Sequence, residues 1–295
     1  MRVRLHYVVS GLFAVEVTLR SIRVICGRGY ITVSGLLAAG ATLRSAVLGW
    51  VVEQLLMKWS FERRSWLMGD KKMKIACISA SNNKLAEEKS ISIRVCSIIK
   101  DIILKETKEN AEVDIIALKD YDIKPCILCG ACYSNGLCIY DEEFNKIIKV
   151  LETVQGMFLV VPHYSPIPSK LLILFEKVNE ITYAGWINNP SYQSPFCNMR
   201  VGIIGHGGMV ENEANIRYYH DNLVTPVANT LKALSFNIVQ PNDDYANGVS
   251  FGLKDDSCLR KSENSIFPDI IQDWEMIEER IKPLIIKGIK EMNIG

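Results

Sequence analysis

The chain has 295 residues, 48% of them hydrophobic and 23% charged, and its formal net charge is +1. This composition is typical of a globular protein with a sizeable core. No basic stripe, internal repeat or hydrolase triad is recognisable, so nucleic acid is not expected as a partner. We expect a cytoplasmic protein.

Residues 1–72 differ in composition from the rest of the chain. Before Met68 there are eight Arg, one Lys and three Glu, whereas lysine is the main basic residue afterwards. We expect residues 1–72 to be an N-terminal extension, non-native or disordered, and the working domain to span residues 73–295. Two alternatives remain open: a genuine extra subdomain, and a membrane-associated segment over Tyr30–Val52, where Arg44 would make insertion costly.

From Met73 the chain alternates short apolar runs with longer amphipathic stretches, which predicts a parallel sheet covered by helices on both faces. Five strands are predicted, over residues 74–79, 111–118, 156–161, 201–204 and 236–239. Helices are predicted over 90–107, 142–152, 168–180, 211–234 and 269–292, and an irregular insertion over 183–198. Right-handed crossovers favour the strand order 2-1-3-4-5, so the expected fold class is α/β, a flavodoxin-like doubly wound five-stranded parallel sheet.

In such a sheet, ligands bind beyond the carboxyl ends of strands one and three, where the strand order reverses. The loop after strand one is polar and leads into a helix, so amides, hydroxyls and side-chain amides there can surround a phosphate. An ordinary polar loop with a serine cap is the alternative. The loop is neither a Walker A loop nor a G-x-G-x-x-G fingerprint. The candidate phosphate ligands are Ser79, Ser81, Asn82, Asn83, Ser90 and Ser92.

Two more loops are expected at the same edge. The one after strand three is stiffened by prolines and carries a tyrosine that can lie beside a planar heterocycle, and the one after strand four is rich in glycine, which lets backbone approach a flat ligand. A rigid loop end and a flexible turn are the respective alternatives, and the two histidines are explained as well by loop hydrogen bonds as by proton transfer. The candidate cofactor-binding residues are Pro162, His163, Tyr164, Ser165, Gly205, His206, Gly207 and Gly208.

Four cysteines follow strand two in a C-x2-C-x2-C-x5-C run. The short spacings hold three thiolates on one turn, and Gly130 and Gly136 let the backbone bend so that a fourth sulfur can close a cage around a cubane cluster. A zinc site and buried thiols without metal are the alternatives, whereas disulfides between such close cysteines would be strained. The candidate metal ligands are Cys126, Cys129, Cys132 and Cys138.

On these motifs, the stretch from Met73 to about Val239 resembles the NAD(P)H-dependent FMN reductase branch of flavodoxin-like proteins, and the cysteine run resembles that of the iron–sulfur flavoproteins. The resemblance implies that the four cysteines ligate a [4Fe–4S] cluster. It maps the family's phosphate loop onto Ser79 to Asn83 with Ser90 and Ser92, its flavin loop onto Pro162 and Tyr164, and its glycine-rich loop onto Gly205 to Gly208. Asn82 and Asn83 stand where Pro and Arg are common in the family, and residues 1–72 have no counterpart.

The function that this implies is an FMN- and [4Fe–4S]-dependent oxidoreductase that passes electrons between NAD(P)H or ferredoxin and an unidentified acceptor. No catalytic side chain is assigned. The alternatives are an NAD(P)H-dependent FMN or quinone reductase without a cluster, and a non-catalytic redox carrier or sensor. We expect a homo-oligomer. The aromatic residues of the insertion, Tyr183, Trp186 and Tyr192, would cover the flavin, form an oligomer contact or pack within the loop.

Overall fold

The structure is a computed structural model. It describes residues 13–18, 21–26, 29–34, 72–84, 90–242, 244–263 and 269–293. The chain divides into two compact units, residues 1–71 and 72–295, which are described separately.

The described part of the first unit is a three-stranded antiparallel sheet. Its strands are β1 (Phe13–Thr18), β2 (Ser21–Cys26) and β3 (Gly29–Ser34), in the order β1-β2-β3. Residues 30–34 of the alternative membrane-associated segment belong to β3. The rest of that segment and most of the predicted extension lie outside the described residues, so both stay predictions. No helix among the described residues is long and apolar enough to cross a membrane.

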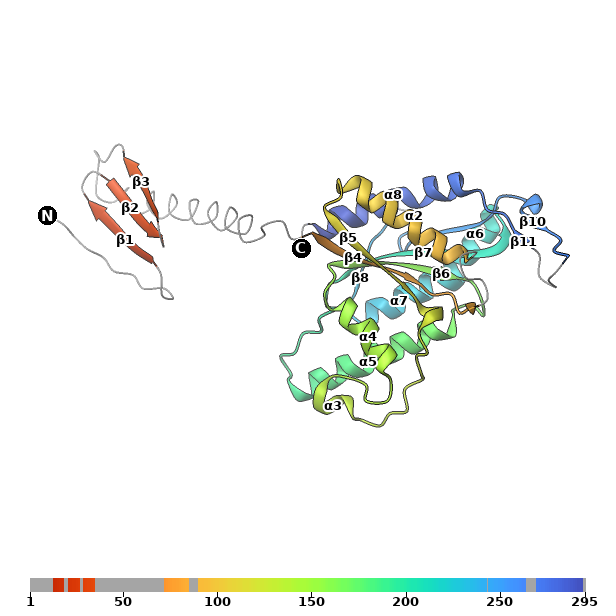
Figure 1. The fold of residues 1–295 in the computed structure, drawn as a ribbon, viewed down its shortest axis with the longest axis horizontal. Coiled ribbons are helices and arrows are strands. Elements are labelled where there is room, and N and C mark those ends of the chain that lie inside the picture. The colour runs from red at the N-terminus through yellow and green to blue at the C-terminus, as the bar shows by residue number, and fades with distance from the viewer. Residues whose placement is uncertain are drawn as a thin grey trace. The chain divides into compact units, whose positions relative to one another are not determined.

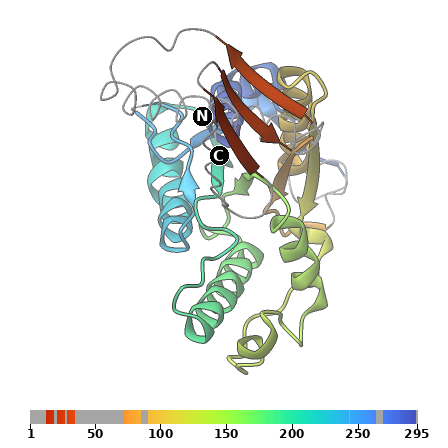
Figure 2. The ribbon, with the colours of Figure 1, turned by 90° about the vertical axis from the view of Figure 1, so that its left-hand side faces the viewer.

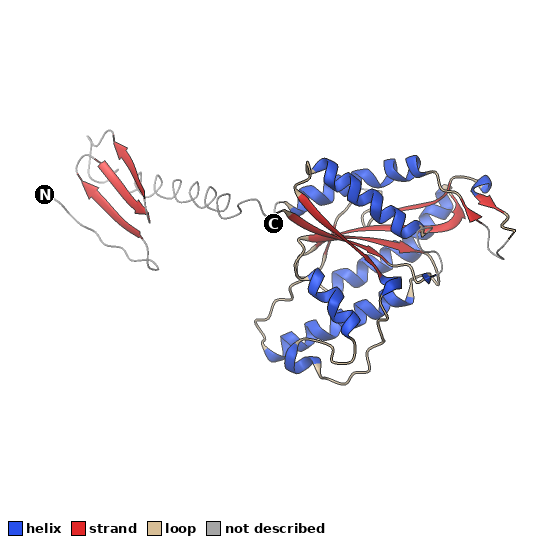
Figure 3. Ribbon diagram, viewed as in Figure 1, coloured by secondary structure: helices blue, strands red, loops and turns tan. Residues whose placement is uncertain are grey.

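The second unit is built on a parallel sheet whose strand order confirms the flavodoxin-like prediction. The order is β5-β4-β6-β7-β8, and every neighbouring pair is parallel. Central strand β6 is buried along its whole length, as expected for an apolar run covered on both faces. Figure 3 shows this sheet between two layers of helices. The strands are β4 (Met73–Ser79), β5 (Ala111–Ala117), β6 (Gly156–Pro162), β7 (Arg200–Val210) and β8 (Asn237–Ile238).

Two separate hydrophobic clusters hold the helices to the two faces of the sheet. Helices α2 (Ile91–Glu106) and α8 (Trp274–Met292) pack on one face. Helices α4 (Glu142–Leu151), α5 (Ser169–Asn188) and α7 (Thr225–Ala233) pack on the other. Figure 1 shows the two layers above and below the sheet.

Strand β7 is longer than predicted because an unpredicted strand supplies it with a partner. Strand β9 (Val249–Leu253) pairs parallel to β7, with Gly205 opposite Ser250 and His206 opposite Phe251. The segment Gly205 to Gly208 is therefore part of a strand, and its prediction as a loop was wrong. A partner more than forty residues away along the chain is not visible as a local pattern.

Helix α5 also extends beyond its predicted end at residue 180. Its buried stripe continues through Ile181 and Ala184, and the helix ends at Asn188, just before Pro190, where a proline disfavours helical backbone. The first part of the predicted irregular insertion 183–198 is therefore helical.

The last two predicted helices differ from the structure in detail. The run predicted over 211–234 consists of α6 (Glu213–Tyr219), a π-helical turn (His220–Val224) and α7. The final helix begins at Trp274 rather than at residue 269, because Asp273 caps it by accepting a hydrogen bond from the amide of Met276 at 3.1 Å. The preceding residues form a short antiparallel pair, β10 (Leu259–Arg260) with β11 (Asp269–Ile270).

Candidate functional site

The carboxyl ends of β4, β6 and β7 meet at one edge of the sheet, as the strand order requires. Ser79, at the end of β4, is in register with Val160, and Pro162, at the end of β6, is in register with His206. The backbone amide of His163 donates to the carbonyl of His206 at 2.7 Å. The loops predicted to bind a cofactor are thus brought together.

The loop after β4 is joined to the loop after β6 by side-chain hydrogen bonds. The hydroxyls of Ser81 and Tyr164 lie 2.9 Å apart. The side-chain amide of Asn82 donates to the hydroxyl of Ser169, at the start of α5, at 3.0 Å, and the amide of Asn83 donates to Ser81 at 3.2 Å. The exposed ring of Tyr164 is therefore anchored at its hydroxyl end.

Two polar atoms in this loop are buried without a hydrogen-bond partner among the described residues. They are the hydroxyl oxygen of Ser79 and the side-chain oxygen of Asn82. A buried polar group without a partner is costly, and such groups in native folds point to an absent ligand or water. The two ends of the Asn82 amide are interchangeable by a flip, so this residue and Ser79 can both donate to a phosphate. The residues present therefore fit an anionic group at the end of β4.

Ser90 and Ser92, also predicted as phosphate ligands, are both buried. Ser90 precedes α2, but its side chain makes no capping hydrogen bond. The hydroxyl of Ser92 lies 2.8 Å from Nε2 of His206, whose ring stacks on Phe251 with 5.3 Å between centroids. The side chains of Ser92 and His206 are thus engaged with each other inside the fold, and their roles in cofactor binding stay predictions.

Burial lowers the pKa of His206 to about 4. The pKa of a histidine in an unfolded chain is near 6.5, so His206 takes up a proton in the unfolded chain as the pH falls below about 6.5. In the folded chain the His206 ring stays neutral until about pH 4. We expect His206 to cost about 2 kcal/mol of folding free energy between pH 7 and pH 5. Urea unfolding of the wild type and of His206→Asn at the two pH values checks this. The variant should lose less stability on acidification, and equal losses would contradict the expectation.

The loop after β6 contacts two tyrosines that were not predicted from the sequence as site residues. His163 Nε2 lies 3.3 Å from the hydroxyl of Tyr218, and the ring of His163 contacts those of Tyr218 and Tyr219 at centroid distances of 5.4 and 5.5 Å. Burial lowers the pKa of His163. The tyrosines end α6, directly before the π-helical turn, a feature that is often found at functional sites. Ser165, in the same loop, is exposed.

Gly207 and Gly208, both in β7, have different surroundings. A Cβ atom added at Gly207 would collide with the hydroxyl of Tyr219, which accepts a hydrogen bond from the amide of Met209 at 2.8 Å. A Cβ atom at Gly208 would meet no atom of the described residues within 4 Å. Gly207 is therefore required by packing, whereas Gly208 borders open space.

The cysteine run lies after β5 and winds beside α4 and α5. Gly130 and Gly136 both have φ of +70°, so the backbone bends at the two glycines as predicted. A four-residue helix, α3 (Cys132–Asn135), lies between them and packs against α5 (Figures 1 and 2). All four cysteines of the run line one small cavity, together with Phe144, Lys177 and Glu180.

The four thiols share this cavity but do not converge on a point. In the described residues, no three Cys, His, Asp or Glu side chains come close enough to hold a single metal ion. The ligands of a cubane bind four different iron atoms, so they stand farther apart than the ligands of one zinc ion. An all-thiol donor set around a shared cavity is chemically suited to a cubane cluster or to zinc, and the choice between them stays a prediction.

Two of these cysteines are held by polar contacts. The amide of Leu128 donates to Sγ of Cys126 at 3.4 Å, and the amide of Cys126 donates to the carboxylate of Glu176 at 3.1 Å. Asn145 accepts from the amide of Cys138 at 3.0 Å and donates to its carbonyl at 2.8 Å. Among the others, burial raises the pKa of the Cys132 thiol.

Helix α5 holds both ends of the cysteine run. Near its start, the ammonium group of Lys170 donates to the carbonyls of Leu118, Lys119 and Tyr121, which precede the run. Two turns later, Lys177 forms an ion pair with Asp141, which follows the run, at 2.5 Å. Burial would raise the pKa of Asp141, but hydrogen bonds from the Lys124 amide, Lys177 and the Phe144 amide hold that pKa below its ordinary value.

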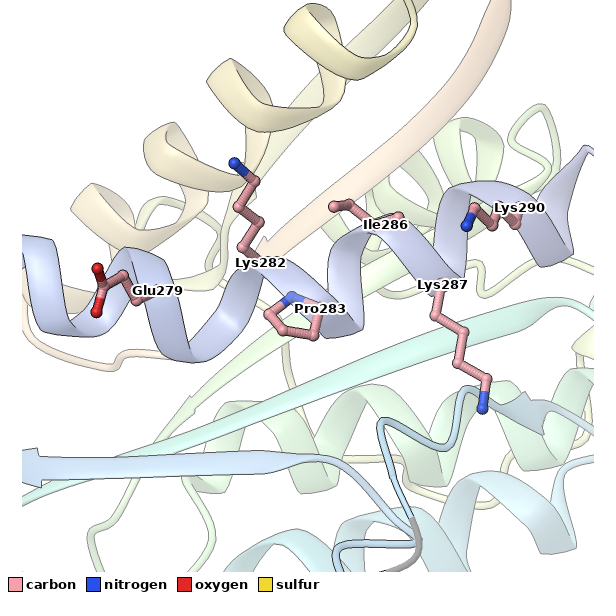
Figure 4. A pocket seen from close by; sticks show the side chains of 6 residues that line it. All are labelled: Glu279, Lys282, Pro283, Ile286, Lys287 and Lys290. Carbon is pink, nitrogen blue, oxygen red and sulfur yellow. The ribbon is translucent and has the colours of Figure 1, made fainter.

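A broader hollow along α8 has no comparable set of groups. Figure 4 shows Lys282 and Lys287 extending to opposite sides of the helix, so its side chains do not converge on a common ligand. The hollow is lined by Glu279, Lys282, Pro283, Ile286, Lys287 and Lys290.

Comparison with known proteins gives the following similarities. Residues 73–214 match the family described as NADPH-dependent FMN reductase. An iron-sulfur flavoprotein from Methanosarcina thermophila is 28% identical over 107 residues, 36% of this chain and 52% of that protein. An iron-sulfur flavoprotein from Archaeoglobus fulgidus is 30% identical over 93 residues, 31% of this chain and 41% of that protein. An oxidoreductase from Corynebacterium diphtheriae of known structure has a TM-score of 0.47 and 12% identity, covering 76% of this chain and 99% of that one.

The two curated relatives are matched over only part of their length. The chain spans 52% of the first and 41% of the second.

Proposed function

Starting from the match of residues 73–214 to the NADPH-dependent FMN reductase family, we propose that the chain is an oxidoreductase that binds FMN where β4, β6 and β7 end. The observation that carries the proposal is a pair of buried polar atoms, on Ser79 and Asn82, that have no hydrogen-bond partner among the described residues. They lie at the strand-order reversal, beside a tyrosine ring that is hydrogen-bonded to Ser81. An anionic end and a flat ring are the two parts of FMN that such a site has to bind.

The residues of the edge have separate roles in this proposal. Ser79, Ser81, Asn82 and Asn83 hold the phosphate, and the ring of Tyr164 covers one face of the flavin. Gly208 borders open space, which leaves room for the heterocycle to approach the backbone of β7. Ser92 and His206 support this edge from inside the fold.

We further propose that Cys126, Cys129, Cys132 and Cys138 bind a [4Fe–4S] cluster. The shared cavity and the curated relatives, both called iron-sulfur flavoproteins, support this assignment. When bound, flavin supplies hydride or single-electron chemistry and the cluster supplies single-electron transfer. The chain's own groups bind, orient and shield these cofactors, with NAD(P)H or ferredoxin as electron donor.

Anaerobic purification of the full chain, with FMN, iron and acid-labile sulfide counts, tests this function. The proposal expects bound FMN, and it expects iron and acid-labile sulfide in amounts equal to each other. Flavin without iron and sulfide would favour the alternative of an FMN or quinone reductase without a cluster, and absence of flavin would contradict the proposal altogether. Steady-state oxidation of NADH or NADPH with an artificial acceptor distinguishes an enzyme from a redox carrier.

Replacing Tyr164 by alanine is expected to weaken FMN binding about tenfold, because the ring contact and its anchored hydroxyl together contribute on the order of 1.5 kcal/mol. Titration of the apoprotein with FMN, followed by flavin fluorescence, measures the loss. Tyr140→Ala is the matched control, since Tyr140 is also exposed but lies outside this edge. Equal affinities for FMN in Tyr164→Ala and the wild type would exclude Tyr164 from the site.

A further inference from the structure

Lys177 and Asp141 form an ion pair that is almost completely buried. Their side chains are 4% and 1% exposed, and Nζ of Lys177 lies 2.5 Å from Oδ2 of Asp141. Burying two charges costs several kcal/mol per ion and seldom stabilises a fold more than an apolar pair would. A pair kept in such a place is therefore better explained by what its charges contact than by stability.

The carboxylate of Asp141 has partners apart from Lys177. It accepts hydrogen bonds from the amide of Lys124 at 2.7 Å and from the amide of Phe144 at 3.0 Å. These backbone contacts fix the carboxylate at the N-terminus of α4, where the helix dipole also favours a negative charge. Asp141 is thus an immobile anion against which the flexible lysine side chain is held.

The ammonium group of Lys177 also contacts a cysteine of the run. Nζ lies 3.6 Å from Sγ of Cys138 and 5.1 Å from the centroid of the Phe144 ring. The backbone of Cys138 is clamped in turn by both ends of the Asn145 side-chain amide. Among the described residues lining the cavity, Glu180 is the other charged group. Cys138 is therefore fixed at its backbone and faces a buried positive charge at its sulfur.

We propose that Lys177, held in place by Asp141, is a positioning residue that fixes Cys138 as the fourth ligand of the cluster and raises the cluster's reduction potential. This inference rests on the proposed cluster. Reduction adds one negative charge to a cluster, and a cation near a ligand sulfur stabilises the reduced form more than the oxidised form. The interaction is strong because the ammonium group is buried, where water screens it little.

The test compares four single variants of the full chain after anaerobic purification, with iron content and the cluster's midpoint potential as readouts. Lys177→Gln removes the cation and should lower the potential. Asp141→Asn removes the neighbouring anion but keeps a side-chain oxygen that can accept a hydrogen bond from Lys177, so the cation stays in place and the potential should rise. Lys177→Arg keeps the charge and should retain both iron and a potential near that of the wild type. Lys146→Gln is the control, because Lys146 makes an exposed ion pair with Glu143 and should leave the potential unchanged.

Opposite shifts in Lys177→Gln and Asp141→Asn support the proposal, because a purely structural defect has no reason to change sign with the charge removed. Shifts of the same sign, or no shift in Lys177→Gln, overturn it. Lys177→Gln could also fail to bind iron, and bound FMN then shows whether its fold is intact. In that case, iron retained in Lys177→Arg supports the proposal, and iron lost from both variants overturns it. A wild-type protein without iron contradicts the cluster itself, whereas iron with unshifted potentials contradicts only the role of Lys177.

Discussion

Replacing Cys129 by serine is expected to abolish iron and acid-labile sulfide in the purified protein while FMN stays bound. Serine is a much poorer ligand for iron than a thiolate, and three remaining sulfurs leave one iron of a cubane without its protein ligand. Cys129 is exposed and lines the cavity, and the edge proposed to bind FMN is built from other loops. Iron, sulfide and flavin counts on the anaerobically purified variant measure the effect.

Cys197→Ser is the matched control for this change. Cys197 is exposed as well, but it lies outside the cysteine run and does not line its cavity. The control should keep the wild-type content of iron and sulfide. Unchanged iron and sulfide in Cys129→Ser would remove that residue from the ligand set, and simultaneous loss of FMN would indicate a collapsed domain rather than a missing ligand.

Replacing Phe158 by alanine is expected to destabilise the domain by about 3–5 kcal/mol. Phe158 is fully buried in β6. Its ring occupies a slot that two glycines leave free: a Cβ atom added at Gly202 or Gly288 would lie 2.6 or 2.8 Å from the ring. Because the slot is formed by backbone of β7 and α8, it cannot collapse around a smaller side chain, and a cavity remains.

Urea unfolding of the full chain at pH 7 measures the loss for Phe158→Ala. Leu172→Ala serves as control, since Leu172 is 47% exposed on α5 and its truncation should change the free energy of unfolding by less than about 0.5 kcal/mol. A loss below about 1 kcal/mol for Phe158→Ala would show that the slot closes after all.

The central sheet could be predicted because its signals are local. The run from Gly156 to Val161 is almost entirely apolar, and it alternates with amphipathic stretches that match α4 and α5. Chain order and right-handed crossovers then restrict the strand order to few possibilities. The place of the cysteine run in the fold could be predicted in the same way, because the run directly follows the second strand in the sequence.

What the sequence did not reveal depends on partners that are distant along the chain. Strand β7 continues through Gly205 to Gly208 with β6 paired on one side and β9 on the other, whereas a glycine-rich sequence locally predicts a turn. Tyr218 and Tyr219 looked like ordinary helical residues until the fold brought His163 against them. The stripe of α5 was predicted, but nothing local identifies Lys177 as the partner of Asp141, 36 positions earlier.

Helix α5 acts as a fixed spacer between the two proposed cofactor sites. Ser169, which contacts the loop after β4, and Lys177, which contacts Cys138, are eight residues apart on one helix, a rise of about 12 Å. A regular helix packed against a sheet changes its length very little, so the two ends cannot approach or separate independently. Within one chain, the rate of electron exchange between flavin and cluster would then be governed by the difference between their potentials and not by a hinge movement.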